Sequence, residues 1–168
     1  MSNSYNDATL VLPENKKTIT VLICVVVRVE NERQRLLFER TIESILSLDT
    51  PDDVQARVAV IDNASLFSVQ DFIATKTSAS IEVVRRTANS IGAARTHGLR
   101  LALAYDCEWL AFVDADIELP MEWLKILTHE LKATSMKDAV GIAAVNRPPH
   151  EGEFARALDF FLGFEYAH

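Results

Sequence analysis

Glycine is scarce in this chain, and the positions of its few glycines exclude two common ways of binding a nucleotide. Only five glycines occur among 168 residues, and the first of them is Gly92. After the first apolar run the chain reads Arg28-Val29-Glu30-Asn31-Glu32. A dinucleotide-binding Rossmann loop and a P-loop both need glycines there, because the backbone must approach the phosphates closely. A nucleotide bound here would have to be held by side chains and a metal.

Cysteine and long apolar runs are also few. Cys24 and Cys107 lie beside or inside apolar runs and have no CxxC partner, which is typical of free thiols in a reducing compartment. The longest apolar stretch, Val21–Val27, has seven residues, whereas a membrane span needs about 20. Residues 1–17 are polar, lack a signal-peptide pattern, and are expected to form a mobile tail. We expect a cytoplasmic protein, and peripheral association with a membrane stays open.

Basic residues are outnumbered by acidic ones. The net charge is −7 and the isoelectric point is near 5.1, which argues against a nucleic-acid partner. The composition, 49% hydrophobic and 24% charged, is that of a globular protein, and we expect one domain over residues 18–168. An acidic protein that binds an anionic phosphate needs a bridging cation or local basic groups.

The hydrophobic pattern predicts strands that alternate with helices, which is typical of an α/β fold with a mostly parallel sheet flanked by helices. Residues 19–29 form a near-continuous β-branched run, as expected of a strand that is buried on both faces. The sequence predicts strands at 19–29, 57–61, 81–85, 109–113 and 139–145, and helices at 32–48, 69–75, 91–105, 120–133 and 154–164.

Polar side chains follow several of these strands. Asn31, Asp62 and the pair Asp114 and Asp116 all fall at carboxyl ends of strands, where open α/β sheets bind ligands. Alternation along an extended chain points Asp114 and Asp116 to the same side, so we expect them to converge. Paired carboxylates favour Mg²⁺ or Mn²⁺, which in turn bind phosphates. The alternatives are a solvated turn for the pair and a local Asx-turn for Asp62.

Four motifs occur in order between residues 19 and 135: Val25–Asn31, Val58–Ser65, Gly92–Gly98, and Phe112–Asp116 followed by Leu119-Pro120. Together they resemble the nucleotide-sugar-dependent glycosyltransferases of family 2, whose fold is GT-A (Rossmann-like). The last motif is similar to the family's DXD signature. Arg28 and Glu30 depart from the pattern, since the family usually has proline and tyrosine there.

The resemblance implies a function and a set of site residues. Asn31, Asp62, Arg95 and Asp114 would bind the nucleotide sugar, and Asp116 with Asp114 would bind Mn²⁺ or Mg²⁺. The implied reaction moves a sugar from a UDP-, GDP- or dTDP-sugar to a hydroxyl of a saccharide or lipid-linked acceptor, with inversion. A carboxylate must deprotonate that hydroxyl, and the sequence does not identify it.

Two other functions remain open. The acceptor half is expected to be short or missing, so the chain could be a non-catalytic or truncated nucleotide-binding module that lacks the catalytic base. The apolar segment 154–164 would be core or, without that half, a homodimer contact. A phosphatase of the haloacid-dehalogenase type also uses an Asp-x-Asp at a strand end. Its motif normally follows the first strand, and Ile117-Glu118 does not fit it.

Overall fold

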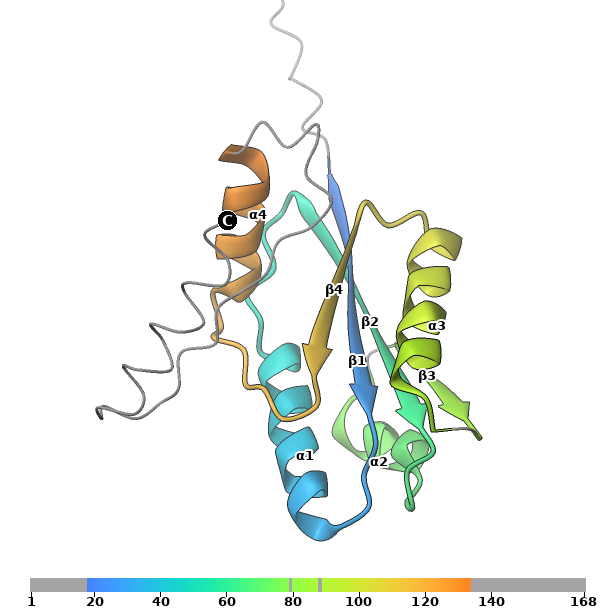
Figure 1. Ribbon diagram of the computed structural model, residues 1–168. Helices are drawn as coiled ribbons and strands as arrows, with labels where there is room; N and C mark the ends of the chain where they lie inside the picture. The colour runs from blue at the N-terminus through green and yellow to red at the C-terminus, as the bar shows by residue number, and fades with distance from the viewer. Residues whose placement is uncertain (1–17, 79, 88, 134–168) are drawn as a thin grey trace, which may run out of the picture. The chain divides into compact units, whose positions relative to one another are not determined.

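The described part of the chain consists of parallel strands that alternate with helices (Figure 1). The computed structural model describes residues 18–78, 80–87 and 89–133. Its strands are β1 (Ile19–Val27), β2 (Val54–Asn63), β3 (Ile81–Arg86) and β4 (Trp109–Asp114), and its helices are α1 (Glu32–Leu46), α2 (Val69–Lys76), α3 (Ile91–Ala104) and α4 (Trp123–Ala133). The strands pair in parallel in the order β3-β2-β1-β4, which confirms the predicted α/β class.

Strand β1 lies between two partners in this sheet. It pairs with β2 on one side and with β4 on the other, so that Ile23 is in register with both Val58 and Ala111. The five residues from Val21 to Val25 have no solvent-exposed surface. Burial of each large side chain of this kind stabilises the fold by roughly 1.5–3 kcal/mol. The prediction that this strand is buried on both faces is confirmed.

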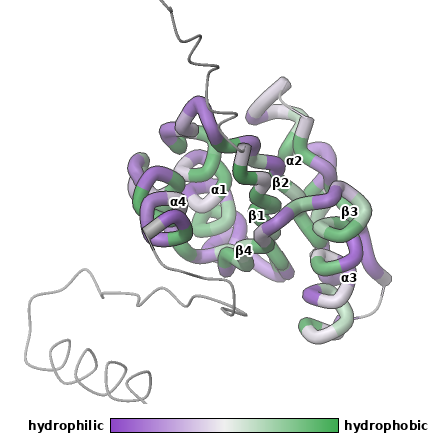
Figure 2. The backbone as a smooth tube through the Cα atoms, turned by 90° about the horizontal axis from the view of Figure 1, so that it is seen from above, coloured by the Kyte–Doolittle hydropathy of each residue, from purple (hydrophilic) through white to green (hydrophobic). Residues whose placement is uncertain are grey.

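Alternation along β1 divides the core into two layers. Val21, Ile23 and Val25 belong to the layer that contains Phe38 of α1, and Leu22 and Cys24 face α3 instead. Figures 1 and 2 show α3 on one side of the sheet and α1 with α4 on the other, with apolar strands between them. The first layer also takes in residues of α2 and α4, namely Val69, Ile73 and Leu124.

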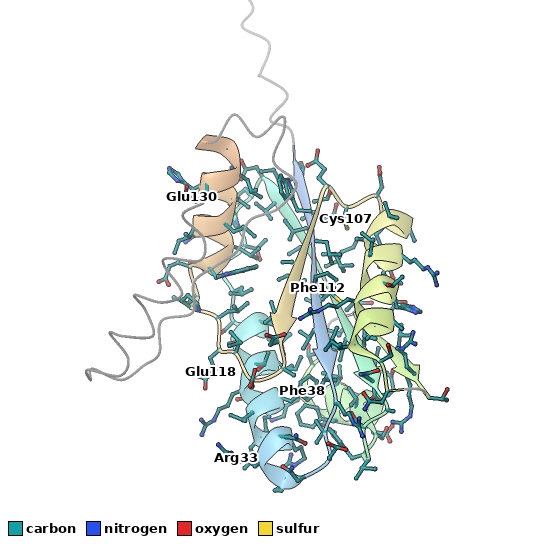
Figure 3. All side chains as sticks on the ribbon, in the orientation of Figure 1. Arg33, Phe38, Cys107, Phe112, Glu118 and Glu130 are labelled. Atoms are coloured by element: carbon teal, nitrogen blue, oxygen red, sulfur yellow. The ribbon has the colours of Figure 1, made fainter. Side chains whose placement is uncertain are left out.

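Helix α3 packs closely on the sheet because Gly98 faces it. A Cβ atom at Gly98 would lie 2.5 Å from Sγ of Cys24 and 3.1 Å from a ring carbon of Phe112. Phe112 projects from β4 in Figure 3. Burial raises the pKa of the Cys24 thiol to about 11, so this group stays protonated and behaves as part of the apolar core.

The start of α4 differs from the prediction. The sequence predicts a helix from Pro120, but α4 begins at Trp123, and the Pro120 carbonyl accepts a hydrogen bond from the Trp123 N–H in the preceding turn. The backbone before the helix is engaged elsewhere: the Leu119 N–H donates to Oγ of Ser44, and the Met121 carbonyl accepts from the Asp49 N–H. These bonds to α1 and to the loop after it hold residues 119–121 outside the helix.

Several predictions concern residues that the structure does not describe. The tail at 1–17, the strand at 139–145, and the helix at 154–164 with its homodimer contact lie outside the described residues and stay predictions. The described residues up to Leu131 belong to one compact unit. Lys132 and Ala133, the last two residues of α4, are not part of it. None of the helices in the described part of the chain combines the length and the hydrophobicity needed to cross a bilayer.

The close packing at Gly98 gives a test of the fold. We expect Gly98→Ala to lower the free energy of unfolding by about 1–2 kcal/mol, because the overlap with Cys24 outweighs the gain in helix propensity. Gly92→Ala is the matched control, since its Cβ would have no heavy atom within 4 Å. Urea denaturation measures both variants. Equal stability of the two would contradict the packing of α3 on β1.

Candidate functional site

The carboxyl ends of β1, β2 and β4 bring the predicted polar residues to one edge of the sheet. Asp62 is in register with Val27, and Asp114 is in register with Val26, one residue earlier on β1. Residues in register on parallel strands point to the same face. Val27 belongs to the layer of α1 and α2, whereas Val26 packs with Ala94 of α3. The two aspartates therefore leave the sheet on opposite faces, with the end of β1 between them.

Asp62 is held inside a hydrogen-bond network. Its side chain is 1% exposed, and Oδ1 accepts the N–H of Ser65 at 2.9 Å. Oδ2 accepts from Nη1 of Arg85 at 2.7 Å. A buried carboxylate requires a charged partner and hydrogen-bond donors of this kind, because desolvation otherwise disfavours its ionised form. Asp62 thus orders the β2–α2 loop around itself, as in the Asx-turn alternative, at the edge where the nucleotide role is also predicted.

The β2–α2 loop is joined in turn to the loop after β1. Oγ of Ser65 accepts the Val29 N–H at 2.9 Å, and the Val29 carbonyl accepts the Leu66 N–H at 2.8 Å. Ser65 and Val29 are both buried. Each of these backbone groups therefore has a partner, and the two loops, residues 28–31 and 64–68, are hydrogen-bonded into one continuous wall at this edge.

Asn31 stands at the start of α1 in this wall. Its Oδ1 accepts the Gln34 N–H at 3.0 Å, so the side chain caps the helix. The neighbouring Arg28 and Glu30 form an ion pair at 2.6 Å, and the Glu30 N–H donates to Oε1 of Gln34 at 2.8 Å. The residues that replace the family's usual proline and tyrosine thus pair with one another and with α1. The cap engages Oδ1 of Asn31, and the amide Nδ2 is the donor that this side chain would offer to a ligand.

Asp114 lies in a different environment from Asp62. Its side chain is 68% exposed, and Oδ1 lies 3.7 Å from Nη2 of Arg95 on α3. The Arg95 guanidinium also lies over the ring of Phe112, 5.9 Å from the ring centre. The structure therefore brings together Asp114 and Arg95, which the sequence analysis placed in the same site. Both groups are open to solvent and could meet an anionic ligand with its counter-ion.

Asp116 does not continue the strand. β4 ends at Asp114, and the Ile117 N–H donates to the Asp114 carbonyl at 3.2 Å, which closes a turn around Ala115 and Asp116. Strand alternation therefore does not set the direction of the Asp116 side chain. The expectation that alternation points the Asp114 and Asp116 side chains to the same side does not apply here. Asp116 is exposed, as is Glu118, whose Oε1 lies 3.8 Å from Nη1 of Arg40. Figure 3 shows Glu118 beside α1.

These acids fit a hard divalent cation in their chemistry. Asp114 and Asp116 supply carboxylate oxygens that face water, and Mg²⁺ and Mn²⁺ commonly take one or two carboxylates and keep other sites for water and phosphate. Among the residues that the structure describes, no group of three or more His, Cys, Asp or Glu could enclose a metal. The remaining ligands of such a cation would come from water and from phosphate oxygens.

Two residues that organise this edge, Asn63 and Arg85, were not singled out from the sequence. Oδ1 of Asn63 accepts the Ser90 N–H at 3.1 Å, and its Nδ2 donates to Oδ1 of Asn89 at 3.1 Å. Asn63 thereby ties the end of β2 to the start of α3. Arg85 is in register with Asp62. An arginine at the end of the predicted third strand was a signal, but only the register of β2 and β3 shows which carboxylate it meets.

The strand order and this edge define a GT-A-like α/β domain with polar and charged groups at the carboxyl ends of its strands. The family model for glycosyl transferase family 2 matches residues 24–165, well over half of the chain. The chain belongs to this family, as the resemblance of its motifs predicted.

A solved structure supports the fold. The chain is similar to the crystal structure of S. aureus TarS 1–349, with a TM-score of 0.55 and 18% sequence identity. The similarity covers 77% of this chain and 39% of the TarS chain, so the chain spans well under half of that structure. No curated protein matches the chain.

The bridge from β2 to α3 gives a prediction about Asn63. We expect Asn63→Ala to lower the free energy of unfolding by about 1–3 kcal/mol, because it removes both hydrogen bonds by which this buried side chain joins β2 to the start of α3. Asn89→Ala removes only one of these two bonds and keeps the bond from the Ser90 N–H to Asn63, so it should cost less than Asn63→Ala. Chemical denaturation of both variants measures the difference. A loss from Asn89→Ala as large as that from Asn63→Ala would contradict this account.

Proposed function

We propose that the carboxyl edge of the sheet is the donor site of a glycosyltransferase that uses a nucleoside-diphosphate sugar. Membership in glycosyl transferase family 2 supports the reaction class. The observation that carries the proposal is the exposed pair of Asp114 and Arg95 beside the buried Asp62 network, with the end of β1 between them. The half formed by the loops after β1 and β2 is an ordered polar wall. The half beside α3 carries one negative and one positive side chain, Asp114 and Arg95.

The two halves suit the two ends of such a donor. Asp62 and Asn31 belong to the wall made by the β1 and β2 loops, which would face the base and ribose. Arg95 and Asp114 lie on the α3 side, where the diphosphate would be held. A guanidinium is a good partner for phosphate oxygens, because its planar donors match their geometry. The donor nucleotide would be that of a UDP-, GDP- or dTDP-sugar.

Asp116 and Asp114 would hold Mn²⁺ or Mg²⁺ beside the diphosphate. When bound, such a cation acts as a Lewis acid that stabilises the charge on the departing nucleoside diphosphate. The protein's own contribution is to keep the two carboxylates at and just after the end of β4 and to place Arg95 next to Asp114. The turn after β4 is anchored to α1 through Ser44 and Leu119, which restricts where Asp116 can lie.

Transfer itself needs an acceptor hydroxyl of a saccharide or of a lipid-linked compound, and a base that removes its proton. With a single displacement the anomeric centre inverts. The acids that the sequence offers after Val145, namely Glu151, Glu153, Asp159 and Glu165, lie outside the described residues.

A donor-binding module without transfer is the second candidate. In the described part of the carboxyl edge, this proposal assigns Asp62, Asp114 and Asp116 to the donor, and Glu30 is paired with Arg28. None of these four acids is therefore assigned as the base that removes the acceptor proton. Incubation of the chain with a UDP-, GDP- or dTDP-sugar and Mn²⁺ distinguishes the two candidates. Release of the free sugar or of a transferred product would exclude the module, and donor binding without turnover would favour it.

Metal-dependent nucleotide binding is the direct test of the donor site. We expect one of UDP, GDP and dTDP to raise the melting temperature only when Mn²⁺ or Mg²⁺ is present, and ligand at a hundred times its Kd should add about 2.7 kcal/mol. Asp116→Ala should abolish the shift, because the cation loses a ligand. EDTA should do the same for the unaltered protein.

Asp52→Ala is the matched control for this substitution. Asp52 is an exposed acid in the turn before β2, at the opposite edge of the sheet. Its loss should leave the metal-dependent shift unchanged. A nucleotide response in Asp116→Ala equal to that of the unaltered chain would refute the metal role of this residue.

A further inference from the structure

Arg85 is bonded to this edge more extensively than an ordinary surface arginine would be. Its side chain is 55% exposed, yet the guanidinium donates to three acceptors in and beside the β2–α2 loop. Nη1 bonds Oδ2 of Asp62 at 2.7 Å and the Phe67 carbonyl at 3.3 Å, and Nη2 bonds the Ser65 carbonyl at 2.8 Å. One side chain from β3 thus holds the beginning, middle and end of the loop that follows β2.

The loop needs such a clamp because its backbone turns unfavourably. Ala64 has a φ of 66°, the left-handed region that costs a residue other than glycine about 1–2 kcal/mol. The contacts on either side oppose this cost: Asp62 accepts the Ser65 N–H, and Arg85 ties both residues together. Without the guanidinium, Asp62 would be a buried charge that lacks its counter-ion.

The clamp extends to the loop after β1. Ser65 and Leu66 bond the N–H and the carbonyl of Val29, and Asn31 follows Val29 by two residues. The position of Val29 therefore depends on Ser65, whose carbonyl is held by Arg85. The whole wall that carries Asp62 and Asn31 is connected to one guanidinium.

We propose that Arg85 is the positioning residue for the base-binding half of the donor site, an inference that rests on the proposed function. It acts through the loops it holds rather than by touching the reacting atoms. A lysine cannot replace it, because a single ammonium group cannot present parallel donors to the Asp62 carboxylate and the Ser65 carbonyl together. A preformed wall lowers the ordering cost that a bound base would otherwise incur.

A positioning role of Arg85 can be distinguished from a general effect on stability, because the two halves of the donor site lie on opposite faces of the sheet. Arg85 shares the face of Asp62, whereas Asp114 and Arg95 lie on the face of α3. Loss of the clamp should therefore weaken the binding of ligands that carry a base and spare the binding of pyrophosphate with Mn²⁺. A residue that only stabilised the fold would affect both ligands equally.

Arg85→Lys in the full chain tests the proposal, because it keeps the positive charge beside Asp62. Without ligand, the amide hydrogens of Val29, Ser65 and Leu66 should exchange about tenfold faster. Calorimetry with UDP, GDP and dTDP, each with Mn²⁺, should show affinity for the recognised nucleotide about tenfold weaker, with pyrophosphate–Mn²⁺ within about twofold of the unaltered chain. Arg57→Lys, the same exchange on β2 away from the carboxyl edge, should change none of these values.

Three results would overturn the positioning role. They are unchanged amide exchange in Arg85→Lys, unchanged nucleotide affinity, and equal losses of affinity for the nucleotide and for pyrophosphate. If Arg85→Lys does not fold, the double variant Ala64→Gly with Arg85→Lys restores stability by relieving the left-handed backbone at Ala64, and it should show the same selective loss. If the unaltered chain binds no nucleotide, that result contradicts the donor site itself and the positioning role with it. This outcome differs from a loss of nucleotide affinity that is seen only in the variant.

Discussion

The parallel pairing of β1 with both β2 and β4 is the constraint on which the rest of the structure depends. Because β1 is buried on both faces, the chain must supply a helix layer on each side, and α3 covers one face while α1, α2 and α4 cover the other. The same pairing aligns the carboxyl ends of β2 and β4 on either side of β1. Polar groups that the core could not tolerate are thereby concentrated at one edge.

At that edge, a shift of one residue in register gives the two aspartates different physical roles. Asp62 turns toward the layer of α1 and α2, where it is buried and needs Arg85 and the Ser65 N–H. Asp114 turns toward α3 and stays in water, with Arg95 nearby. The buried Asp62 carboxylate keeps its fixed partners, whereas an exposed carboxylate such as Asp114 can exchange its partner for a cation. The edge therefore combines an ordered half with a half that remains available to a charged ligand.

Most of the fold could be predicted from the sequence because its signals are local. The β-branched run of β1 and the alternation of strands and helices indicated the class and the described elements to within a few residues. The start of α4 was wrong, because the bonds from Ser44 and Asp49 to residues 119–121 join distant parts of the chain. The ion-pair partner of Asp62 was missed for a similar reason: Arg85 is opposite Asp62 only through the register of β2 and β3. The roles of the site residues toward a ligand stay predictions.

Paramagnetic broadening by Mn²⁺ tests directly whether this edge binds a nucleoside diphosphate with its cation at the end of β4. Amide spectra of the labelled chain would be recorded with the recognised nucleotide, first with Mg²⁺ and then with a trace of Mn²⁺. We expect selective loss of signals from Asp114 to Ile117 and from the first turn of α3, with the amide of Ser65 less affected. Broadening centred on another part of the molecule, or equal broadening throughout, would contradict this expectation.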